Sequence, residues 1–309
     1  MRILYYNNCW FTNVGEAFID IGALQLIKNI FNNPQIACIS DMTDYYIHQE
    51  KNREKTLLGK NKFKISNYIS NNVYENFTAD YIILAGMFAS EDYLRSEGRK
   101  MVDFHVRKGT KIIFLGLGSQ TYNKREYDLF SDYLRKIQPA IVVTRDNLTY
   151  KTYKDCCKCI NGIDCAFWIR EVFNPMGFGK RDYSIVSFNR LKEKPIITFD
   201  QDEKIIRPWH MQFSYSDKVL ENGILISDTP YDYLTAYANA KRVYTDLVHA
   251  TIVSLMYETP VKYFYFDERS TAFEVFPELI VDENGFMILP KNHLIEIKKE
   301  IENKIKNNI

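Results

Sequence analysis

Short apolar runs separated by segments of helical periodicity constrain the fold of this chain most. Three runs, at 80–85 (DYIILA), 111–117 (KIIFLGL) and 140–144 (AIVVT), are almost continuously apolar. Strands of this kind are buried on both faces, which is typical of a parallel sheet covered by helices. The same half also predicts strands at 2–6 and 35–40 and helices at 15–31, 90–108, 126–137 and 147–154. We therefore expect the α/β class.

The length of the chain predicts two domains. It has 309 residues, whereas a single hydrophobic core stops growing at roughly 250–300 residues. The segment FNPMGFGK at 173–180 has no periodicity and is typical of a linker. Beyond it we expect strands at 183–188, 195–199, 224–227, 242–245 and 261–266 and helices at 230–239 and 249–257. The prediction is two Rossmann-like, doubly wound domains facing a cleft, residues 1–176 and 177–292, followed by an amphipathic helix at 293–309.

The balance of charges excludes one class of function. The 40 Lys and Arg residues against 39 Asp and Glu residues give a formal net charge of +1, whereas dedicated nucleic-acid binders carry a basic excess. No apolar run approaches the roughly 18 residues of a membrane span. The first residues, MRILYYNNCWFTN, are typical of a strand rather than of a secretory signal. We expect no nucleic-acid partner, no membrane span and a cytoplasmic location.

The cysteines do not form a metal-binding pattern. Cys156, Cys157, Cys159 and Cys165 crowd into one irregular cluster. A structural zinc site needs paired C-x2–4-C arms around a separate loop, and no second arm follows. We expect reduced structural thiols and no metal.

The first candidate site segment is Asn13-Val-Gly15-Glu16, at the start of the predicted helix 15–31. In open parallel sheets, ligands bind beyond the carboxyl ends of the strands. The free backbone N–H groups of this helix start favour an anion, and Gly15 allows a close approach. Asn13 and Glu16 also resemble a capping box, which is purely structural. The two interpretations are compatible.

A second candidate segment, LGLGSQ at 115–120, follows a buried strand and contains Ser119 and Gln120. Its two glycines suggest backbone close to a ligand, but G-x-G without a third glycine is a weak dinucleotide signal. The chain has no G-x-x-x-x-G-K-[ST] and no G-x-S-x-G. A P-loop nucleotidase and an α/β-hydrolase are therefore disfavoured.

Two arginines are candidates for anion binding. Arg145 follows the strand 140–144 and could clamp a carboxylate or phosphate, although pairing with Asp146 or Asp164 inside the protein is the favoured interpretation. Arg190 ends the strand YSIVSFNR, and its position directs it toward the cleft between the domains. It is the better candidate for binding a ligand.

The most informative segment is TDLVHA at 245–250, which joins a strand to an apolar helix. His249 lies in the first turn of that helix, beside Thr245 at the strand end. The positive end of a helix dipole lowers an imidazole pKa, which suits a proton donor or acceptor or a phosphate ligand. A histidine at a helix start is more often structural, so both interpretations stay open.

Together and in this order, these motifs resemble the polysaccharide pyruvyl transferase family, from residue 13 to about residue 276. The matching pieces are N-x-G-E at 13–16, where the family usually has N-x-G-D, DYIILAG at 80–86, LGLGSQ at 115–120, RD at 145–146, DCAF at 164–167, and TDLVHA at 245–250 followed by LMYETP at 255–260. The resemblance implies a GT-B-like pair of Rossmann-type domains with the active site between them.

The resemblance also implies an activity in polysaccharide biosynthesis. The family transfers the enolpyruvyl carbon skeleton of phosphoenolpyruvate to a sugar of a cell-surface glycan or its precursor, usually as a cyclic pyruvate ketal. It implies phosphoenolpyruvate as co-substrate, no other cofactor, and a glycan acceptor as partner. Whether the chain forms a homo-oligomer stays open.

The resemblance assigns roles to the candidate residues. His249 is implied as the acid or the phosphate ligand and Arg190 as the cationic clamp of the donor. Asn13, Gly15 and the Ser119-Gln120 turn would border the cleft from the other domain. The remaining substrate-binding candidates in this set are Glu16, Arg145, Thr245 and Arg269, the last where the family often has a lysine.

Two departures from the family pattern leave alternatives open. Leu247 stands where some members have an arginine two residues before the histidine, and Ala250 replaces a glycine. A lost arginine would remove a bidentate partner of the donor. One alternative is a GT-B glycosyltransferase that uses a nucleotide sugar, whose diphosphate would suit the same helix starts. The other is a non-catalytic, glycan-binding member of the family.

Overall fold

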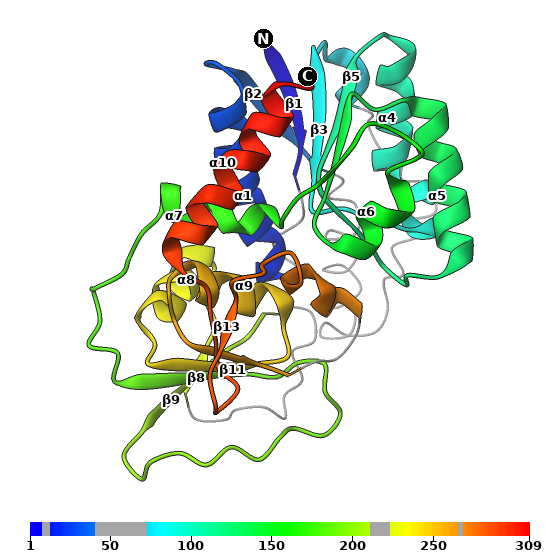
Figure 1. Ribbon diagram of the computed structural model, residues 1–309. Helices are drawn as coiled ribbons and strands as arrows, with labels where there is room; N and C mark the ends of the chain where they lie inside the picture. Colours follow the sequence, from blue (N-terminus) through cyan, green and yellow to red (C-terminus); the bar gives the residue numbers. More distant parts are fainter. Residues whose placement is uncertain (8–12, 41–72, 211–222, 265–267) are drawn as a thin grey trace, which may run out of the picture.

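Two parallel sheets with their helices make up the part of the chain that the structure describes (Figure 1). This computed structural model describes residues 1–7, 13–40, 73–210, 223–264 and 268–309. We call residues up to 172, with the first sheet, the first lobe, and residues 183–289, with the second sheet, the second lobe. The predicted α/β class with two parallel-sheet domains is confirmed.

The first sheet is parallel, with the strand order β2-β1-β3-β5-β6-β7. Its strands are β1 (Arg2–Tyr6), β2 (Gln35–Ile39), β3 (Tyr81–Ala85), β5 (Lys111–Ser119), β6 (Ile141–Thr144) and β7 (Cys159–Asn161), with the short β4 (Phe88–Ala89) paired to the end of β5. The order reverses at β1, because β2 lies on one side of it and all later strands lie on the other. Such a switch point leaves a crevice at the carboxyl ends of the strands.

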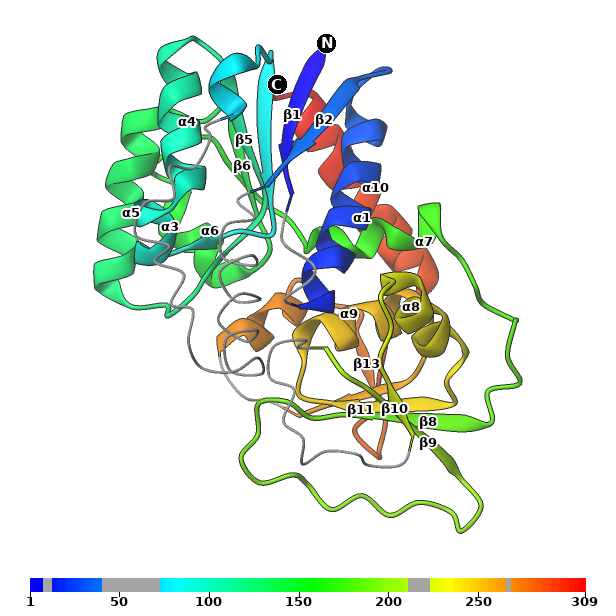
Figure 2. The ribbon, with the colours of Figure 1, turned by 180° about the vertical axis from the view of Figure 1, so that it is seen from behind.

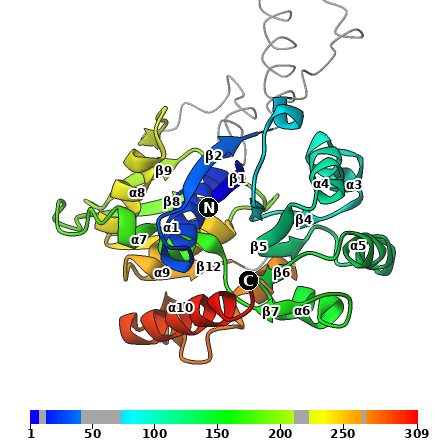
Figure 3. The ribbon, with the colours of Figure 1, turned by 90° about the horizontal axis from the view of Figure 1, so that it is seen from above.

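Helices cover both faces of the first sheet (Figure 3). They are α1 (Val14–Ile30), η2 (Val73–Asn76), α3 (Glu91–Arg95), α4 (Glu97–Arg107), α5 (Lys124–Ile137), α6 (Asn147–Tyr153), η3 (Cys165–Trp168) and α7 (Ile169–Val172). Alternate strand residues point to opposite faces. Thus Ile83 packs in the core with α1, whereas Ile82 and Leu84 pack in the core with α4 and α5.

The expected helix at 90–108 is two helices. Ser96 has an extended backbone (φ −79°, ψ 165°), and its side chain accepts a hydrogen bond from Arg99 N at 3.2 Å. Serine at such a position caps a new helix rather than continuing the old one. The prediction of one continuous helix was therefore wrong at this residue.

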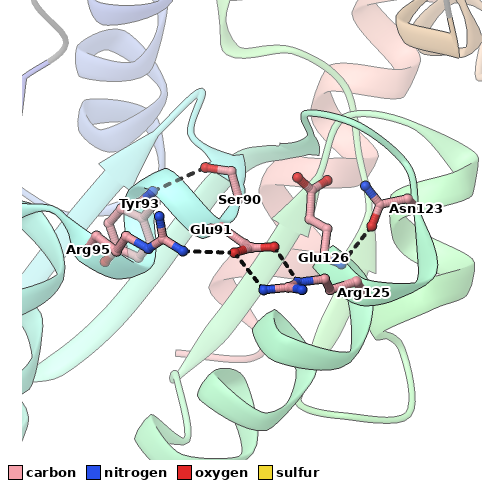
Figure 4. A network of polar contacts seen from close by, with 7 residues as sticks. All are labelled: Ser90, Glu91, Tyr93, Arg95, Asn123, Arg125 and Glu126. Atoms are coloured by element: carbon pink, nitrogen blue, oxygen red, sulfur yellow. Dashed lines mark hydrogen bonds and ion pairs between the residues drawn. The ribbon is translucent and has the colours of Figure 1, made fainter.

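An exposed ion-pair cluster ties α3 to α5 (Figure 4). The Glu91 carboxylate accepts a hydrogen bond from Arg95 Nη2 at 3.1 Å and another from Arg125 Nε at 2.7 Å. Exposed pairs of this kind contribute only about 0–1 kcal/mol each. The cluster therefore orients the two helices, whereas their apolar faces hold them to the sheet.

The second sheet has the order β10-β9-β8-β11-β12-β14-β13. Its strands are β8 (Tyr183–Ser187), β9 (Lys204–Pro208), β10 (Ile224–Leu225), β11 (Arg242–Thr245), β12 (Val261–Tyr263), β13 (Ile280–Val281) and β14 (Met287–Ile288). The strands from β10 to β12 are parallel, and β14 and β13 add antiparallel pairs. A second switch point lies between β8 and β11. The last two residues of the strand expected at 261–266 lie outside the described residues.

The strand expected at 195–199 does not form, and β9 takes its place beside β8. Residues 195–200 have no regular secondary structure. Just before β9, Glu203 bonds to Ser184 Oγ and to Arg242 Nη2, the latter at 2.7 Å. These bonds attach this later segment to β8 and β11. An apolar, β-branched composition alone does not specify which segment pairs with a strand edge.

One apolar core runs through both lobes. The helices of the second lobe are α8 (Pro230–Asn239), α9 (Val248–Met256) and η5 (Glu268–Phe273). Figure 2 shows α8 and α9 on the face of the second sheet that points toward the first lobe. There Phe18 of α1, Trp168 of η3 and Leu255 of α9 belong to one buried cluster. The segment expected as a linker, 173–180, joins lobes that share this core.

The last helix, α10 (Lys291–Lys306), returns to the first lobe and runs beside α1 (Figures 1 and 3). It begins two residues before the predicted 293. Glu302 Oε1 accepts hydrogen bonds from Trp168 Nε1 at 2.7 Å and from Asn29 Nδ2 at 2.8 Å, and Lys298 pairs with Glu171. In the described part of the chain, no helix is both long and apolar enough to cross a membrane.

We predict that Glu302→Ala lowers the free energy of unfolding by about 1–3 kcal/mol, because it leaves the indole N–H of the buried Trp168 without its acceptor. Urea titration followed by circular dichroism measures this change. Glu300→Ala is the matched control, since Glu300 makes only an exposed pair with Lys304 and its loss costs less than about 1 kcal/mol. Equal effects of the two substitutions would contradict the assigned role of Glu302.

Candidate functional site

A cavity of about 320 Å³ lies where the two switch points face each other, beyond the carboxyl ends of β1, β6, β8 and β11. Six of the predicted site residues line it: Asn13, Glu16, Arg145, Arg190, His249 and Arg269. Of these, Asn13, Glu16 and Arg145 come from the first lobe, and the other three come from the second lobe. A ligand in this cavity would touch both lobes.

The N-terminal ends of α1 and α9 meet at this cavity. Asn13 caps α1, since its Oδ1 accepts a hydrogen bond from Gly15 N at 2.9 Å and its carbonyl accepts one from Glu16 N at 3.0 Å. Gly15 packs directly on the His249 ring, and a Cβ at this position would overlap Nδ1. The glycine is therefore required here by close packing on the imidazole.

Asp164 is a buried carboxylate between two cationic groups. Its Oδ2 lies 3.2 Å from Arg145 Nη1 and 3.7 Å from His249 Nε2, and its Oδ1 accepts a hydrogen bond from Ala166 N at 2.9 Å. Burial opposes the charge, but the His249 and Arg145 side chains outweigh it and lower the pKa of Asp164 to about 2. The predicted internal pairing of Arg145 is thus with Asp164, although Arg145 also lines the cavity.

The Arg145 guanidinium is held on its other sides as well. It stacks over the Phe88 ring at 4.6 Å from the centroid and packs on Gly118, where a Cβ would lie 2.5 Å from Nε. Burial opposes its charge, but Asp164 and nearby acidic groups raise its pKa. Arg145 therefore stays charged in a fixed position at the cavity wall.

His249 and Glu16 are two proton-carrying groups in the wall of the cavity. Among the described residues, His249 Nε2 has no hydrogen-bond partner, although it is buried and faces Asp164. Burial raises the pKa of Glu16, and the charges of His249 and Arg145 partly offset this rise. A carboxyl group and an imidazole in one cavity are groups that can serve as general base and general acid.

Asp246 positions the turn that carries Arg190. Its two carboxylate oxygens accept hydrogen bonds from the backbone N–H groups of Asn189, Arg190 and Leu191, at 3.0, 2.8 and 2.8 Å. Next to it, Thr245 is fully buried, where its hydroxyl donates to the Ser187 carbonyl at 2.8 Å and accepts from Leu247 N at 3.0 Å. Thr245 therefore joins β11 to β8 and does not line the cavity.

Ser119 and Gln120 also lie away from the cavity lining. Ser119 is buried at the end of β5, and Gln120 begins the turn before α5. In that turn, Asn123 Oδ1 accepts a hydrogen bond from Glu126 N at 2.9 Å (Figure 4). Glu126 Oε1 in turn accepts one from the backbone N–H of Gln120 at 3.0 Å. This is a capping arrangement, so the turn organises the start of α5.

Seven polar or aromatic residues of the cavity wall were not among the predicted site residues: Phe88, Tyr122, Asp146, Asn189, His210, Asp246 and Tyr263. Asp146 caps α6 through Thr149 N at 2.6 Å, and Tyr122 donates to Asp146 Oδ2 at 3.3 Å. His210 follows β9, the strand that the sequence pattern did not predict. Correct placement of β9 would have put His210 at the carboxyl edge of the second sheet.

The described residues contain no group of three or more His, Cys, Asp and Glu side chains that could hold a metal ion. The cysteines of the predicted cluster are free thiols. Burial raises the pKa of Cys157 to about 12, and it also raises that of Cys165. Cys157 and Cys165 are therefore thiols rather than thiolates near neutral pH.

We predict that Gly15→Ala costs about 1–3 kcal/mol of stability when His249 is present, because the added methyl displaces the ring. In a His249→Ala background the same change should be neutral or stabilising by about 0.5–1 kcal/mol, since alanine favours a helix over glycine. A double-mutant cycle from urea titrations measures the coupling. Additive effects would contradict direct packing between the two residues.

We also predict a pH dependence from His210, which is buried with Nε2 2.8 Å from Tyr237 Oη. Burial, with the charge of His249, lowers its folded pKa from 6.5 to about 3. Between these values the unfolded chain binds the extra proton, so this residue's contribution to stability is complete above pH 6.5 and is lost as the pH falls toward 3.

The free energy of unfolding should fall by up to about 1.4 kcal/mol per pH unit as the pH is lowered through this range. Because glutamine does not titrate in this pH range, the His210→Gln variant should show a flatter dependence of stability on pH. Urea titrations of both proteins at several pH values between 6.5 and 4.5 measure the two slopes. Parallel slopes would show that His210 is protonated as readily in the folded protein as in the unfolded chain.

Solved structures share this fold at low sequence identity. An uncharacterized protein from Klebsiella pneumoniae aligns with a TM-score of 0.50 and 15% identity, over 89% of this chain and 87% of that chain. The UDP-GlcNAc 2-epimerase from Neisseria meningitidis bound to UDP-GlcNAc aligns with a TM-score of 0.53 and 10% identity, over 100% of this chain and 95% of that chain. A putative UDP-N-acetylglucosamine 2-epimerase from Listeria monocytogenes aligns with a TM-score of 0.54 and 10% identity, over 100% of this chain and 91% of that chain. These likenesses show the GT-B-like fold alone.

The sequence itself matches one family. No curated protein matches it, but the profile of the polysaccharide pyruvyl transferase family matches residues 13–267. That span contains the residues that meet at the cavity from both lobes: the helix start at Asn13, the buried Arg145–Asp164 pair and His249. The chain therefore belongs to the polysaccharide pyruvyl transferase family.

Proposed function

We propose that this protein transfers a pyruvyl group from phosphoenolpyruvate to a sugar of a cell-surface glycan or its precursor and closes a cyclic ketal. Membership of the family supports a glycan-modifying transferase; the donor and the ketal product are our proposal. The observation that carries it is the cavity in which His249, paired with Asp164, shares the walls with Arg145, Arg190 and Arg269. A cytoplasmic location stays a prediction.

The charges in the cavity suit a small donor with a phosphate and a carboxylate. Arg190 and Arg269 line the cavity from the second lobe, and we assign them to the anionic groups of the donor. The cavity volume, about 320 Å³, lies at the lower end of the usual range for ligand sites, about 300–1,000 Å³. This size suits phosphoenolpyruvate with one acceptor ring entering from the side.

The reaction needs one acid and one base. His249 donates a proton to the methylene carbon of phosphoenolpyruvate, and positive charge develops at the carbon that bears the phosphate. A sugar hydroxyl attacks that carbon and passes its proton to Glu16, whose raised pKa makes it a suitable acceptor. The Asp164 carboxylate faces the imidazole that gives the proton, with Oδ2 3.7 Å from His249 Nε2.

The second half of the reaction releases phosphate. The C–O bond to phosphate breaks, and a second hydroxyl of the same sugar attacks the carbon and closes the ketal. Of the two hydroxyl protons, one replaces the proton that His249 gave and the other leaves with the phosphate. The net reaction therefore consumes no proton and needs no oxidant.

Leu247 occupies the cavity wall where some family members have arginine. It is 8% exposed and directly follows Asp246, whose carboxylate binds the backbone of the turn at 189–191. The donor in this protein would therefore rely on Arg190 and Arg269 for its anionic groups. A non-catalytic, glycan-binding role and the use of a nucleotide sugar are the two outcomes that the experiment below separates from this proposal.

We predict phosphate release when the protein is incubated with phosphoenolpyruvate and a panel of sugar acceptors. His249→Gln should lower kcat by about 100-fold or more, because the proton donor is lost. Arg190→Ala and Arg269→Ala should each raise KM for phosphoenolpyruvate about 10–100-fold, the loss of a charge-assisted hydrogen bond of about 1.5–3 kcal/mol. A colorimetric phosphate assay gives these values.

Arg107→Ala is the matched control, since Arg107 is exposed in the last turn of α4 and does not line the cavity. It should leave kcat and KM unchanged. Thermal stabilisation by UDP-sugars but not by phosphoenolpyruvate would favour the nucleotide-sugar reaction. Unchanged phosphate release by His249→Gln would contradict the catalytic role of this residue.

A further inference from the structure

A second pocket, of about 230 Å³, adjoins the cavity that contains His249 at the same edge of the second sheet. We call that first cavity the donor cavity. The walls of the second pocket come from the ends of β8 and β9 and from the loop at 194–199. We call it the aromatic pocket, because Phe188, Phe199 and Trp209 form much of its wall. Neither the family pattern nor the sequence motifs drew attention to these residues.

The aromatic rings are held in place by packing and by the backbone. Phe188 packs edge-to-face on Phe264, with ring centroids 5.2 Å apart, and Phe199 packs on Tyr244 at 5.7 Å. Trp209 N donates to the Leu225 carbonyl at 3.0 Å, and the Trp209 carbonyl accepts from Tyr233 Oη at 3.0 Å. These contacts fix the rings of Phe188 and Phe199 and the backbone of Trp209 at the pocket wall.

The chemistry of these walls suits a sugar that carries an anionic group. A pyranose ring has an apolar C–H face that packs on an aromatic ring, while its hydroxyl edge needs polar partners. Lys194 and Arg207 line the same pocket and match a phosphate or a carboxylate. The volume lies below the roughly 300 Å³ at which sites for larger ligands begin, which favours a single sugar ring over a whole nucleotide sugar.

Asn189 connects the two sites, because it lines both the aromatic pocket and the donor cavity. Its backbone is fixed by the hydrogen bond from Asn189 N to Asp246 Oδ1. The next residue, Arg190, lines the donor cavity with His249. A sugar seated in the aromatic pocket can thus extend its hydroxyl edge across Asn189 toward the donor.

We propose that the aromatic pocket is the acceptor subsite and binds a sugar ring that bears an anionic substituent. The assignment of this ligand as acceptor rests on the proposed function. Trp209 supplies the apolar platform, and Arg207 and Lys194 face the anionic group. The anionic group could be the phosphate of an activated precursor or the carboxylate of an acidic sugar, and the probes below distinguish these sources.

The test is binding of galactose 1-phosphate, glucuronic acid, galactose and UDP to the full chain, measured by saturation-transfer NMR and calorimetry. We expect the wild-type protein to bind at least one of the two anionic sugars more tightly than galactose. Trp209→Ala should weaken binding of all three sugars roughly tenfold or more. Arg207→Gln should weaken binding of the anionic sugars alone, which distinguishes a local effect from misfolding.

Phe178→Ala is the matched control, since this aromatic side chain is 86% exposed and lies outside both sites. It should bind every probe as the wild type does, and all three variants should bind phosphoenolpyruvate unchanged. Sugar binding that survives Trp209→Ala, or binding of UDP without binding of any sugar, would overturn the acceptor subsite. The same holds if no sugar binds the wild type.

These results separate the subsite from the proposed donor. If the sugars bind as expected but phosphoenolpyruvate neither binds nor releases phosphate, the proposed function fails and the sugar site stands. If phosphoenolpyruvate reacts but Trp209→Ala leaves KM for the acceptor unchanged, the donor stands and the aromatic pocket is not the acceptor subsite.

Discussion

The buried carboxylate of Asp164 is the interaction on which the site depends. It lies at the start of η3 in the first lobe, yet it faces both Arg145 beside β6 and His249 at the start of α9 in the second lobe. A buried charge without partners is strongly destabilising. Arg145 balances this charge within the first lobe, and the packing of the second lobe against the first adds His249 as a second neighbour of Asp164 at the cavity.

Close backbone packing makes this arrangement possible. At Gly15 the His249 ring occupies the space that a Cβ would need, and at Gly22 the Cys165 carbonyl does the same. Because α1 approaches η3 and α9 this closely, one apolar core continues from the first lobe into the second. The return of α10, anchored through Glu302, closes the first lobe over the same helix.

Local patterns predicted many elements well, whereas pairing between distant segments could not be predicted. The helix expected at 230–239 and the strand expected at 242–245 coincide with α8 and β11, because capping, periodicity and apolar content are local properties. The strand at 195–199 was wrong, because bonds of Glu203 to Ser184 and Arg242 bring a later segment to that edge. His210 was missed for the same reason.

The α/β class, the two parallel-sheet domains and the loops at which ligands would bind could be predicted from the sequence, since they follow from apolar runs and helical periods along the chain. The motifs of the family are also local. Which candidates share a cavity depends on the folded arrangement, which brings Glu16, Arg145 and His249 together and leaves Gln120 in a capping turn. Side-chain contacts between lobes depend on how two sheets pack, and no spacing within either half encodes that packing.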